Sequence, residues 1–128
     1  MGIITLMQIK YTDSHEWIEC DGKKGRVGIT THAQKELGEI VYVELPKVGD
    51  QVKAGEEIAI LESTKAAADI YCPVSGTITC VNTALLEDIS LLNASPSSAG
   101  YLFEITLTHP EEVEMLLSEE GYGSLVNQ

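Results

Sequence analysis

Residues 55–76 read Gly55-Glu56-Glu57-Ile58-Ala59-Ile60-Leu61-Glu62-Ser63-Thr64-Lys65-Ala66-Ala67-Ala68-Asp69-Ile70-Tyr71-Cys72-Pro73-Val74-Ser75-Gly76, and this stretch decides the fold. Two apolar runs, at 58–62 and 67–71, lie on either side of the segment 63–66, and 73–76 follows as a turn. Short apolar and β-branched runs bounded by turn residues are typical of strands. The stretch therefore predicts a β-hairpin with Lys65 near its tip.

The same pattern continues outward in both directions and predicts a mainly β fold. Strands are expected at 9–11, 17–19, 26–30, 40–45, 77–81 and 101–107. In the last of these, alternation places Tyr101, Phe103, Ile105 and Leu107 on one face. Residues 85–100 are expected to form a long surface loop. Many short strands separated by Gly and Pro turns are typical of a sandwich or a barrel.

Two helices are expected to interrupt the strands. Thr31 and Gln34 form a capping box for a short internal helix at 32–37, and Gly38 supplies its C-cap. Thr108 and Glu111 form a second capping box, which predicts a C-terminal helix over about 109–120. A length of 128 residues suits one domain. We therefore expect a single domain over 1–128, with its core at about 9–107.

The charge balance and the cysteines limit the functional classes. The 20 acidic and 8 basic residues give a formal charge of −12, which repels nucleic-acid phosphates and anionic lipid headgroups. No apolar run is long enough to cross a bilayer, and the amino-terminal residues do not resemble a signal peptide. We expect a cytoplasmic monomer with reduced thiols, in which Cys72 and Cys80 are half-buried. No metal site is predicted, because His15 and His109 have no ligand nearby in the sequence.

The functional hypotheses depend on Lys65. A lysine at a hairpin tip has little to pack against, and the small side chains of Ala66, Ala67 and Ala68 leave its backbone open to a modifying enzyme. An ordinary solvated lysine is the plain alternative. Another alternative is an enzyme with Lys65 as a Schiff-base nucleophile. That role needs burial or cationic neighbours, and an exposed tip in an acidic chain supplies neither.

Five blocks of the sequence, taken in order, resemble one family. They are 14–17 (SHEW), 28–34 (GITTHAQ), 37–46 (LGEIVYVELP), 62–71 (ESTKAAADIY) and 73–76 (PVSG). The match runs from 11 to about 117 and resembles the H protein of the glycine cleavage system, whose fold is similar to that of lipoyl and biotinyl carrier domains. The resemblance implies a barrel-sandwich hybrid that acts as a non-catalytic carrier subunit.

The resemblance implies that lipoic acid is the cofactor, joined as an amide to the ε-amine of Lys65. It implies four kinds of partner: glycine decarboxylase (P protein), which loads an aminomethyl group from glycine; aminomethyltransferase (T protein), which unloads it; dihydrolipoyl dehydrogenase (L protein), which reoxidises the dithiol; and the lipoate-attaching enzymes. Tethering the cofactor to a small carrier raises its effective concentration at each active site.

The resemblance also implies roles for five other residues. Glu62 matches a carboxylate that the family presents to lipoate-attaching enzymes. Ser14, Glu16, His32 and Asp69 match positions in the cleft that holds the loaded arm, and Glu16 is a suitable anionic partner for a protonated amine. Each also has a plain alternative, as a turn cap, a surface acid or the first residue of a helix.

Other carriers remain as alternatives. Some H-like proteins pass lipoyl groups to 2-oxoacid dehydrogenases, and the sequence does not separate this relay from glycine cleavage. A biotin carrier is disfavoured because methionines do not flank Lys65. The chain departs mildly from the family pattern at Thr64 and Cys72. It departs more at 95–101, where an acidic residue is missing and Tyr101 replaces a tryptophan.

Overall fold

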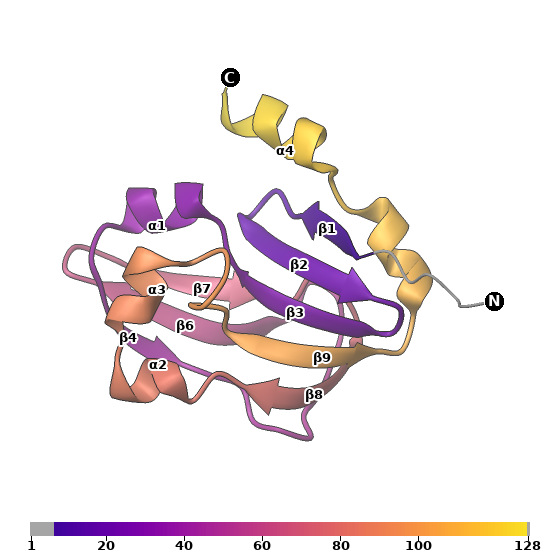
Figure 1. Cartoon of the computed structure of the whole chain (residues 1–128), viewed down its shortest axis with the longest axis horizontal. Coiled ribbons are helices and arrows are strands. Elements are labelled where there is room, and N and C mark those ends of the chain that lie inside the picture. Colours follow the sequence, from indigo (N-terminus) through magenta and orange to yellow (C-terminus); the bar gives the residue numbers. More distant parts are fainter. Residues whose placement is uncertain (1–6, 128) are drawn as a thin grey trace.

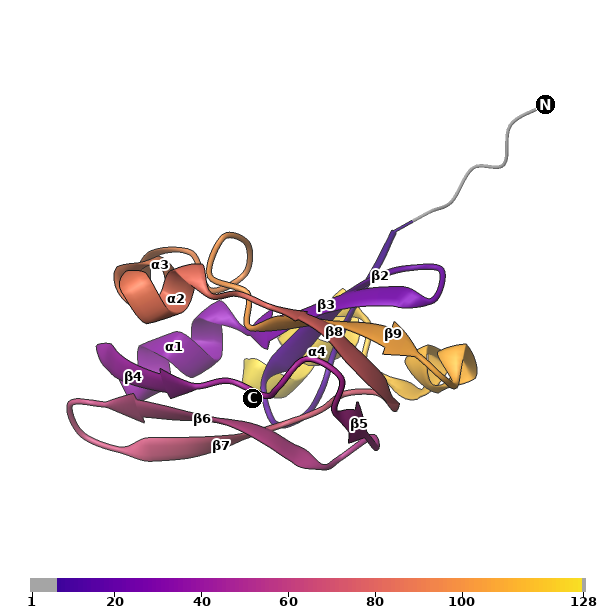
Figure 2. The same ribbon diagram turned by 90° about the horizontal axis from the view of Figure 1, so that it is seen from below.

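A computed structural model of the chain describes residues 7–127 as two antiparallel sheets. The larger sheet has the order β1-β2-β3-β9-β8-β5, from β1 (Gln8–Tyr11), β2 (Glu16–Asp21), β3 (Lys24–Ile29), β9 (Phe103–Leu107), β8 (Gly76–Val81) and β5 (Gln51–Val52). The smaller sheet has the order β4-β6-β7, from β4 (Ile40–Glu44), β6 (Glu57–Ser63) and β7 (Ala67–Tyr71). Figure 2 shows the sheets as two layers. The mainly β prediction is confirmed.

Alternating side chains of the two sheets meet in one core. In β9, Phe103, Ile105 and Leu107 are buried, as the alternation predicted, whereas Tyr101 lies before the strand and is half-buried. The fully buried core side chains include Ile18, Val27, Ile29, Ile40, Leu61, Ile78, Leu85, Leu92, Leu102 and Phe103. Trp17 is also buried, and it lies opposite Gly28 in the β2–β3 ladder.

The internal helix, α1 (Thr31–Leu37), begins one residue earlier than predicted. Its N-cap is Thr30, whose Oγ1 accepts a hydrogen bond from Ala33 N at 3.1 Å, so Thr31 is the first helical residue and does not cap. Gly38 is the C-cap, as predicted, with a φ of 84°. Its ψ of −153° places it outside the αL conformation usual at a C-cap, in a region that is open mainly to glycine.

The segment predicted as a long loop contains two short helices, α2 (Ala84–Glu87) and α3 (Ser90–Ala94). Leu85 and Leu92 are almost fully buried, so core packing holds these turns in a helical conformation. Neither helix has a side-chain N-cap bond and each is too short to show a helical period. The prediction of a loop over 85–100 was therefore wrong for lack of a local signal.

The C-terminal helix expected over 109–120 is divided. The structure has a 3₁₀ helix, η1 (Pro110–Met115), followed by α4 (Glu119–Val126). Leu117 N and O exchange backbone hydrogen bonds of 2.8 and 2.9 Å with Tyr11, which removes Leu117 from a helical conformation. Ser118 then caps α4 by accepting a bond from Gly121 N. Thr108 caps nothing, because the N-cap of η1 is His109.

The cysteines are free, and Cys20 and Cys72 are buried. Cys80 is exposed, contrary to the prediction, because the β8–β9 register shifts between Ile78 and Cys80 and turns both Thr79 and Cys80 outward. Within residues 7–127, no helix is long and apolar enough to span a membrane. Residues 1–6, for which the sequence predicts no signal peptide, lie outside the described part of the chain.

Candidate functional site

Lys65 lies in the middle of the three-residue loop, 64–66, that joins β6 to β7. Ser63 N donates to Ala66 O at 2.7 Å and closes the hairpin, while Ser63 Oγ accepts hydrogen bonds from Lys65 N at 3.2 Å and Ala66 N at 3.0 Å. One serine thus satisfies two backbone donors of the turn, as Ser side chains do in such turns. The Lys65 side chain is exposed, and so are Ala66 and Ala67.

A second contact fixes the hairpin tip against the end of α1. Thr64 N donates to Glu39 O at 3.1 Å, and a β-carbon built at Gly38 would lie 3.2 Å from Lys65 Cε. The stem of Lys65 therefore lies over the Gly38 backbone. In Figures 1 and 2 the hairpin extends to the end of the molecule where α1 and α3 also lie.

The segment under the tip is itself held by Asn93 of α3. Asn93 Oδ1 accepts from Ile40 N at 2.8 Å, and Asn93 Nδ2 donates to Ile40 O at 2.9 Å. The amide takes the place of a neighbouring strand for the first residue of β4. Asn93 therefore positions Gly38 and Glu39 just before that strand, and through them the tip that carries Lys65.

One face of β7 leads away from Lys65. Because side chains alternate along a strand, Ala67, Asp69 and Tyr71 share a face, and buried Ile70 lies on the other. Tyr71 N, at the far end of β7, donates to Glu16 Oε2 at 3.4 Å. The attachment hairpin and Glu16 are therefore joined by a single five-residue strand about 16 Å long.

Glu16 is a buried carboxylate with hydrogen-bond donors around it. Only 1% of the residue is exposed, and its Oε1 accepts from Thr12 Oγ1 and Ser14 Oγ, each at 2.6 Å. Burial raises the pKa of Glu16 above its usual value, and the bonds from Ser14, Thr12 and Tyr71 oppose that rise. Within residues 7–127 no ion pair involves Glu16. A buried acid without a cation is suited to a cationic ligand.

Glu16 borders a hollow of about 340 Å³. Ser14, Thr12 and Tyr71 line the same hollow, together with Tyr11, Asp13, Gly55, Cys72, Pro73, Met115, Leu116 and Leu117. The structure thus brings Ser14 and Glu16 together. Asp69 is exposed on the face of β7 that leads there, and Glu62 is exposed on β6 beside the tip, opposite Ala67.

His32 is not among the residues that line this hollow. It lines a separate hollow of about 450 Å³ with Trp17, Thr30 and Tyr122, and its Nε2 lies 2.9 Å from Glu36 Oε1. Sequence reasoning missed Thr12 and Tyr71 as partners of Glu16. The four-residue spacing of Thr12 and Glu16 is a weak local signal. The contact between Tyr71 and Glu16 joins residues 55 positions apart, so it has no local signal in the sequence.

Comparisons with known proteins agree with this geometry. The model of the glycine cleavage H-protein family matches residues 9–128. The chain belongs to this family. It is 47% identical over 116 residues to the glycine cleavage system H protein of Methylacidiphilum infernorum, covering 91% of each chain. It is 49% identical over 119 residues to that of Thermotoga maritima, covering 93% of this chain and 96% of the relative.

A solved structure gives the same result for the fold of this chain. The crystal structure of a glycine cleavage system H protein from Mycobacterium marinum matches with a TM-score of 0.85 and 37% identity, covering 94% of this chain and 98% of the other. The predicted barrel-sandwich fold is confirmed. The relatives' names do not favour the alternative of a lipoyl relay.

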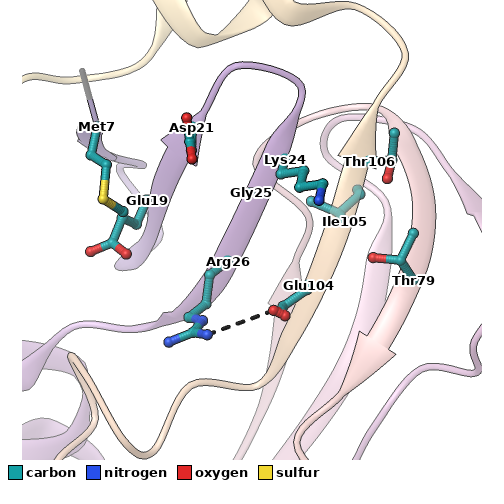
Figure 3. Close-up of a pocket in the computed structure, with 10 residues that line it drawn as sticks. All are labelled: Met7, Glu19, Asp21, Lys24, Gly25, Arg26, Thr79, Glu104, Ile105 and Thr106. Atoms are coloured by element: carbon teal, nitrogen blue, oxygen red, sulfur yellow. Dashed lines mark ion pairs between the residues drawn. The ribbon is translucent and has the colours of Figure 1, made fainter. Parts of the chain in front are cut away.

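The structure also explains how this chain accommodates Tyr101. The Arg26 guanidinium lies 4.3 Å from the centre of the Tyr101 ring and 3.6 Å from Glu104 Oε1. Arg26 and Glu104 line a hollow of about 420 Å³ on the larger sheet (Figure 3), formed by side chains of β2, β3, β8 and β9. None of the predicted site residues lines that hollow, so we do not assign the carrier site there.

Proposed function

We propose that this chain carries the aminomethyl group in glycine cleavage, with lipoic acid joined as an amide to Lys65 Nζ. Membership of the glycine cleavage H-protein family supports the carrier role. The attachment point rests on one observation: Lys65 is exposed in a three-residue loop whose backbone is fixed by Ser63, and small alanines follow it. An attaching enzyme therefore meets a defined backbone and a free amine.

The residues around Lys65 fit a long acyl arm. The lipoyl group supplies a dithiol that holds the carried aminomethyl group, and the protein supplies attachment and orientation. The face of Ala67, Asp69 and Tyr71 leads from Lys65 toward the Glu16 hollow. In this proposal Lys65 is the attachment point of the arm, the attaching enzyme recognises Glu62, and Asp69 lies along the path of the arm.

Glu16 and Ser14 are proposed to hold the carried amine. Glu16 is buried and has hydrogen-bond donors, and no residue within 7–127 forms an ion pair with it, so a protonated amine would supply the missing positive charge. Enclosing the amine beside Glu16 also keeps water from it during transfer. The resemblance assigns His32 to the same cleft; in the structure His32 lines a neighbouring hollow, and its role toward the arm stays a prediction.

The partners follow from the proposed chemistry. A decarboxylase loads the carrier, an aminomethyltransferase unloads it, and dihydrolipoyl dehydrogenase reoxidises the dithiol. The formal charge of −12 favours encounter with basic surfaces on these enzymes. In this proposal the chain is one non-catalytic carrier domain that acts as a monomer in the cytoplasm, because the reactive groups belong to its cofactor and its partners.

The attachment is tested by mass. The protein is purified from its own host under lipoate-replete conditions, and its intact mass and the peptide containing Lys65 are measured. We expect an increase of one lipoyl group on that peptide, lost in Lys65→Arg and retained in Lys53→Arg, which alters another exposed turn. An unmodified chain, or modification at another lysine, contradicts the proposal.

The role of Glu16 is tested by the lifetime of the loaded carrier. Glu16→Gln removes the charge and keeps the shape, so the amine is expected to be lost to solution several-fold faster. Glu19→Gln, in the same strand, is the matched control and leaves the lifetime unchanged. An unchanged lifetime in Glu16→Gln contradicts the assignment.

A further inference from the structure

Two histidines and a glutamate that are separate in the sequence meet beside α1. His15 lies before β2, and His32 and Glu36 lie one turn apart on α1. One ligand atom from each of the three lies within 4.8 Å of the others. The two imidazole rings are 4.8 Å apart between centroids, and His32 Nε2 is 2.9 Å from Glu36 Oε1.

The backbone and a neighbouring phenol fix the direction of His15. It is the non-glycine residue with positive φ in the described chain, at 74°, a conformation that is uncommon outside Gly, Asn, Asp and His. Its Nδ1 lies 2.8 Å from Tyr122 Oη, which in turn lies 2.7 Å from Thr30 Oγ1. With Nδ1 engaged, Nε2 is the ring nitrogen left for a ligand.

We propose that His15, His32 and Glu36 bind a divalent transition-metal ion of the zinc class. Two imidazoles and one carboxylate are a common donor set for such ions, and imidazole disfavours Mg²⁺ and Ca²⁺. In the structure the three ligand atoms lie within 4.8 Å of one another. Metal–ligand bonds of about 2.0–2.2 Å require these atoms to be closer than that. Small side-chain rotations achieve this, because Glu36 and His32 are partly exposed, with 65% and 32% of their side chains accessible.

The surroundings resemble those of built metal sites in one respect. A metal-binding histidine usually donates its other ring nitrogen to a fixed oxygen, which sets its tautomer and orientation. Tyr122 Oη occupies that position for His15, and Thr30 holds Tyr122. Tyr122 belongs to α4, His15 precedes Glu16, and both ligands from α1 follow Thr30. A bound ion would therefore connect α1 to the loop that presents Glu16, with α4 as support.

Binding is tested on the full-length, untagged chain by competition between Zn²⁺ and a coloured chelator. We expect one ion per chain and at least about tenfold weaker binding in His15→Asn, His32→Gln and Glu36→Gln, because each loses a ligand. Asn is chosen at position 15 because it tolerates positive φ. His109→Gln is the matched control, since His109 also pairs with a glutamate, Glu111, at 3.5 Å.

Further variants separate this site from other metal-binding groups. Cys80→Ser removes the exposed thiol, and Lys65→Arg removes the proposed lipoyl attachment; both are expected to bind Zn²⁺ normally. Zn²⁺ binding by these two variants does not depend on lipoyl attachment, so the metal site is tested separately from the carrier proposal. Tyr122→Phe is expected to weaken binding about tenfold while circular dichroism shows a folded chain, which identifies Tyr122 as a positioning residue.

Proton NMR of the wild-type chain tests the same site without relying on variants that fold poorly. In the wild-type chain, Zn²⁺ is expected to shift the imidazole proton resonances of His15 and His32 and to leave those of His109 unchanged. The proposal is overturned if the three histidines shift alike. It is equally overturned if His15→Asn and His32→Gln, shown to be folded, bind Zn²⁺ as tightly as the wild type.

Discussion

Lys65 lies directly over Gly38: a β-carbon at position 38 would stand 3.2 Å from Lys65 Cε and 3.8 Å from Nζ. Gly38 combines a φ of 84° with a ψ of −153°, a backbone conformation open mainly to glycine. The glycine that ends α1 therefore has two roles. It allows the chain to turn into β4, and it leaves room for the stem of the proposed attachment lysine.

This contact predicts a specific effect of Gly38→Ala. The substitution is expected to destabilise the protein by about 1–3 kcal/mol because of backbone strain, and to slow lipoylation of Lys65 several-fold by displacing its stem. Gly49→Ala is the matched control. Gly49 also has a positive φ, of 95°, but a β-carbon there would meet nothing within 4 Å. The Gly49→Ala protein should lose stability but keep the wild-type rate of lipoylation at Lys65. Equal lipoylation rates in Gly38→Ala and Gly49→Ala would show that the contact between Gly38 and the Lys65 stem does not affect lipoylation.

The buried Glu16 predicts a pH dependence of stability. Burial raises its pKa above the usual 4.5, so the folded chain holds this proton more tightly than the unfolded chain does. The corresponding stability is present below the unfolded-state pKa and is lost as the pH rises through the higher folded-state pKa. Glu16→Gln does not titrate. Its stability relative to the wild type should therefore increase from about pH 4 toward neutral pH.

The check is urea unfolding of both proteins across this range, in which the contributions of the other titrating groups cancel in the difference. A difference that is constant with pH, or that decreases toward neutral pH, would contradict the predicted shift.

The cysteines are predicted to differ in reactivity. Burial raises the pKa of Cys20 to about 11 and that of Cys72 to about 12, so their thiolates are scarce near neutral pH. Cys80 is exposed. N-ethylmaleimide should label Cys80 at least about tenfold faster in the native protein, with the lipoyl group kept oxidised. Peptide mass spectrometry reads the sites, and all three should react in guanidinium chloride. Early labelling of Cys72 would refute the buried placement.

The packing of Trp17 predicts a cost for Gly28→Ala. A β-carbon at Gly28 would lie 2.7–2.8 Å from the Trp17 indole, so the ring must move and the protein should lose about 1–3 kcal/mol. Because Trp17 is the single tryptophan, its fluorescence reports both the displacement and the unfolding transition.

Gly123→Ala in α4 is the matched control for that substitution. No contact within 4 Å of a β-carbon there arises from residues 7–127, and alanine favours a helix over glycine by about 0.8–1.0 kcal/mol. This variant should be as stable as the wild type or more so, with unchanged tryptophan emission. A Gly28→Ala protein that behaves the same way would contradict the packing described.

Most strands were predictable from the sequence because their signals are local. Alternation in 103–107 and the apolar runs around 63–66 depend on neighbours a few residues away, and the exposed Lys65 at the hairpin tip follows from the same runs. The errors arose where a local signal was absent or where a distant contact overrode it. Helices α2 and α3 are too short for a period, and Leu117 leaves the helix because Tyr11 pairs with it across the fold.

Local signals in the sequence are thus sufficient for the strand pattern, the hairpin that presents Lys65 and the acidic character of the chain. Tertiary structure alone decided the environment of Glu16, which depends on Tyr71 of another sheet, and the meeting of His15 with His32 and Tyr122. The physical reason is that strand and turn preferences act between near neighbours. The burial of a charge and the convergence of ligand atoms depend on contacts that form only when distant segments pack together.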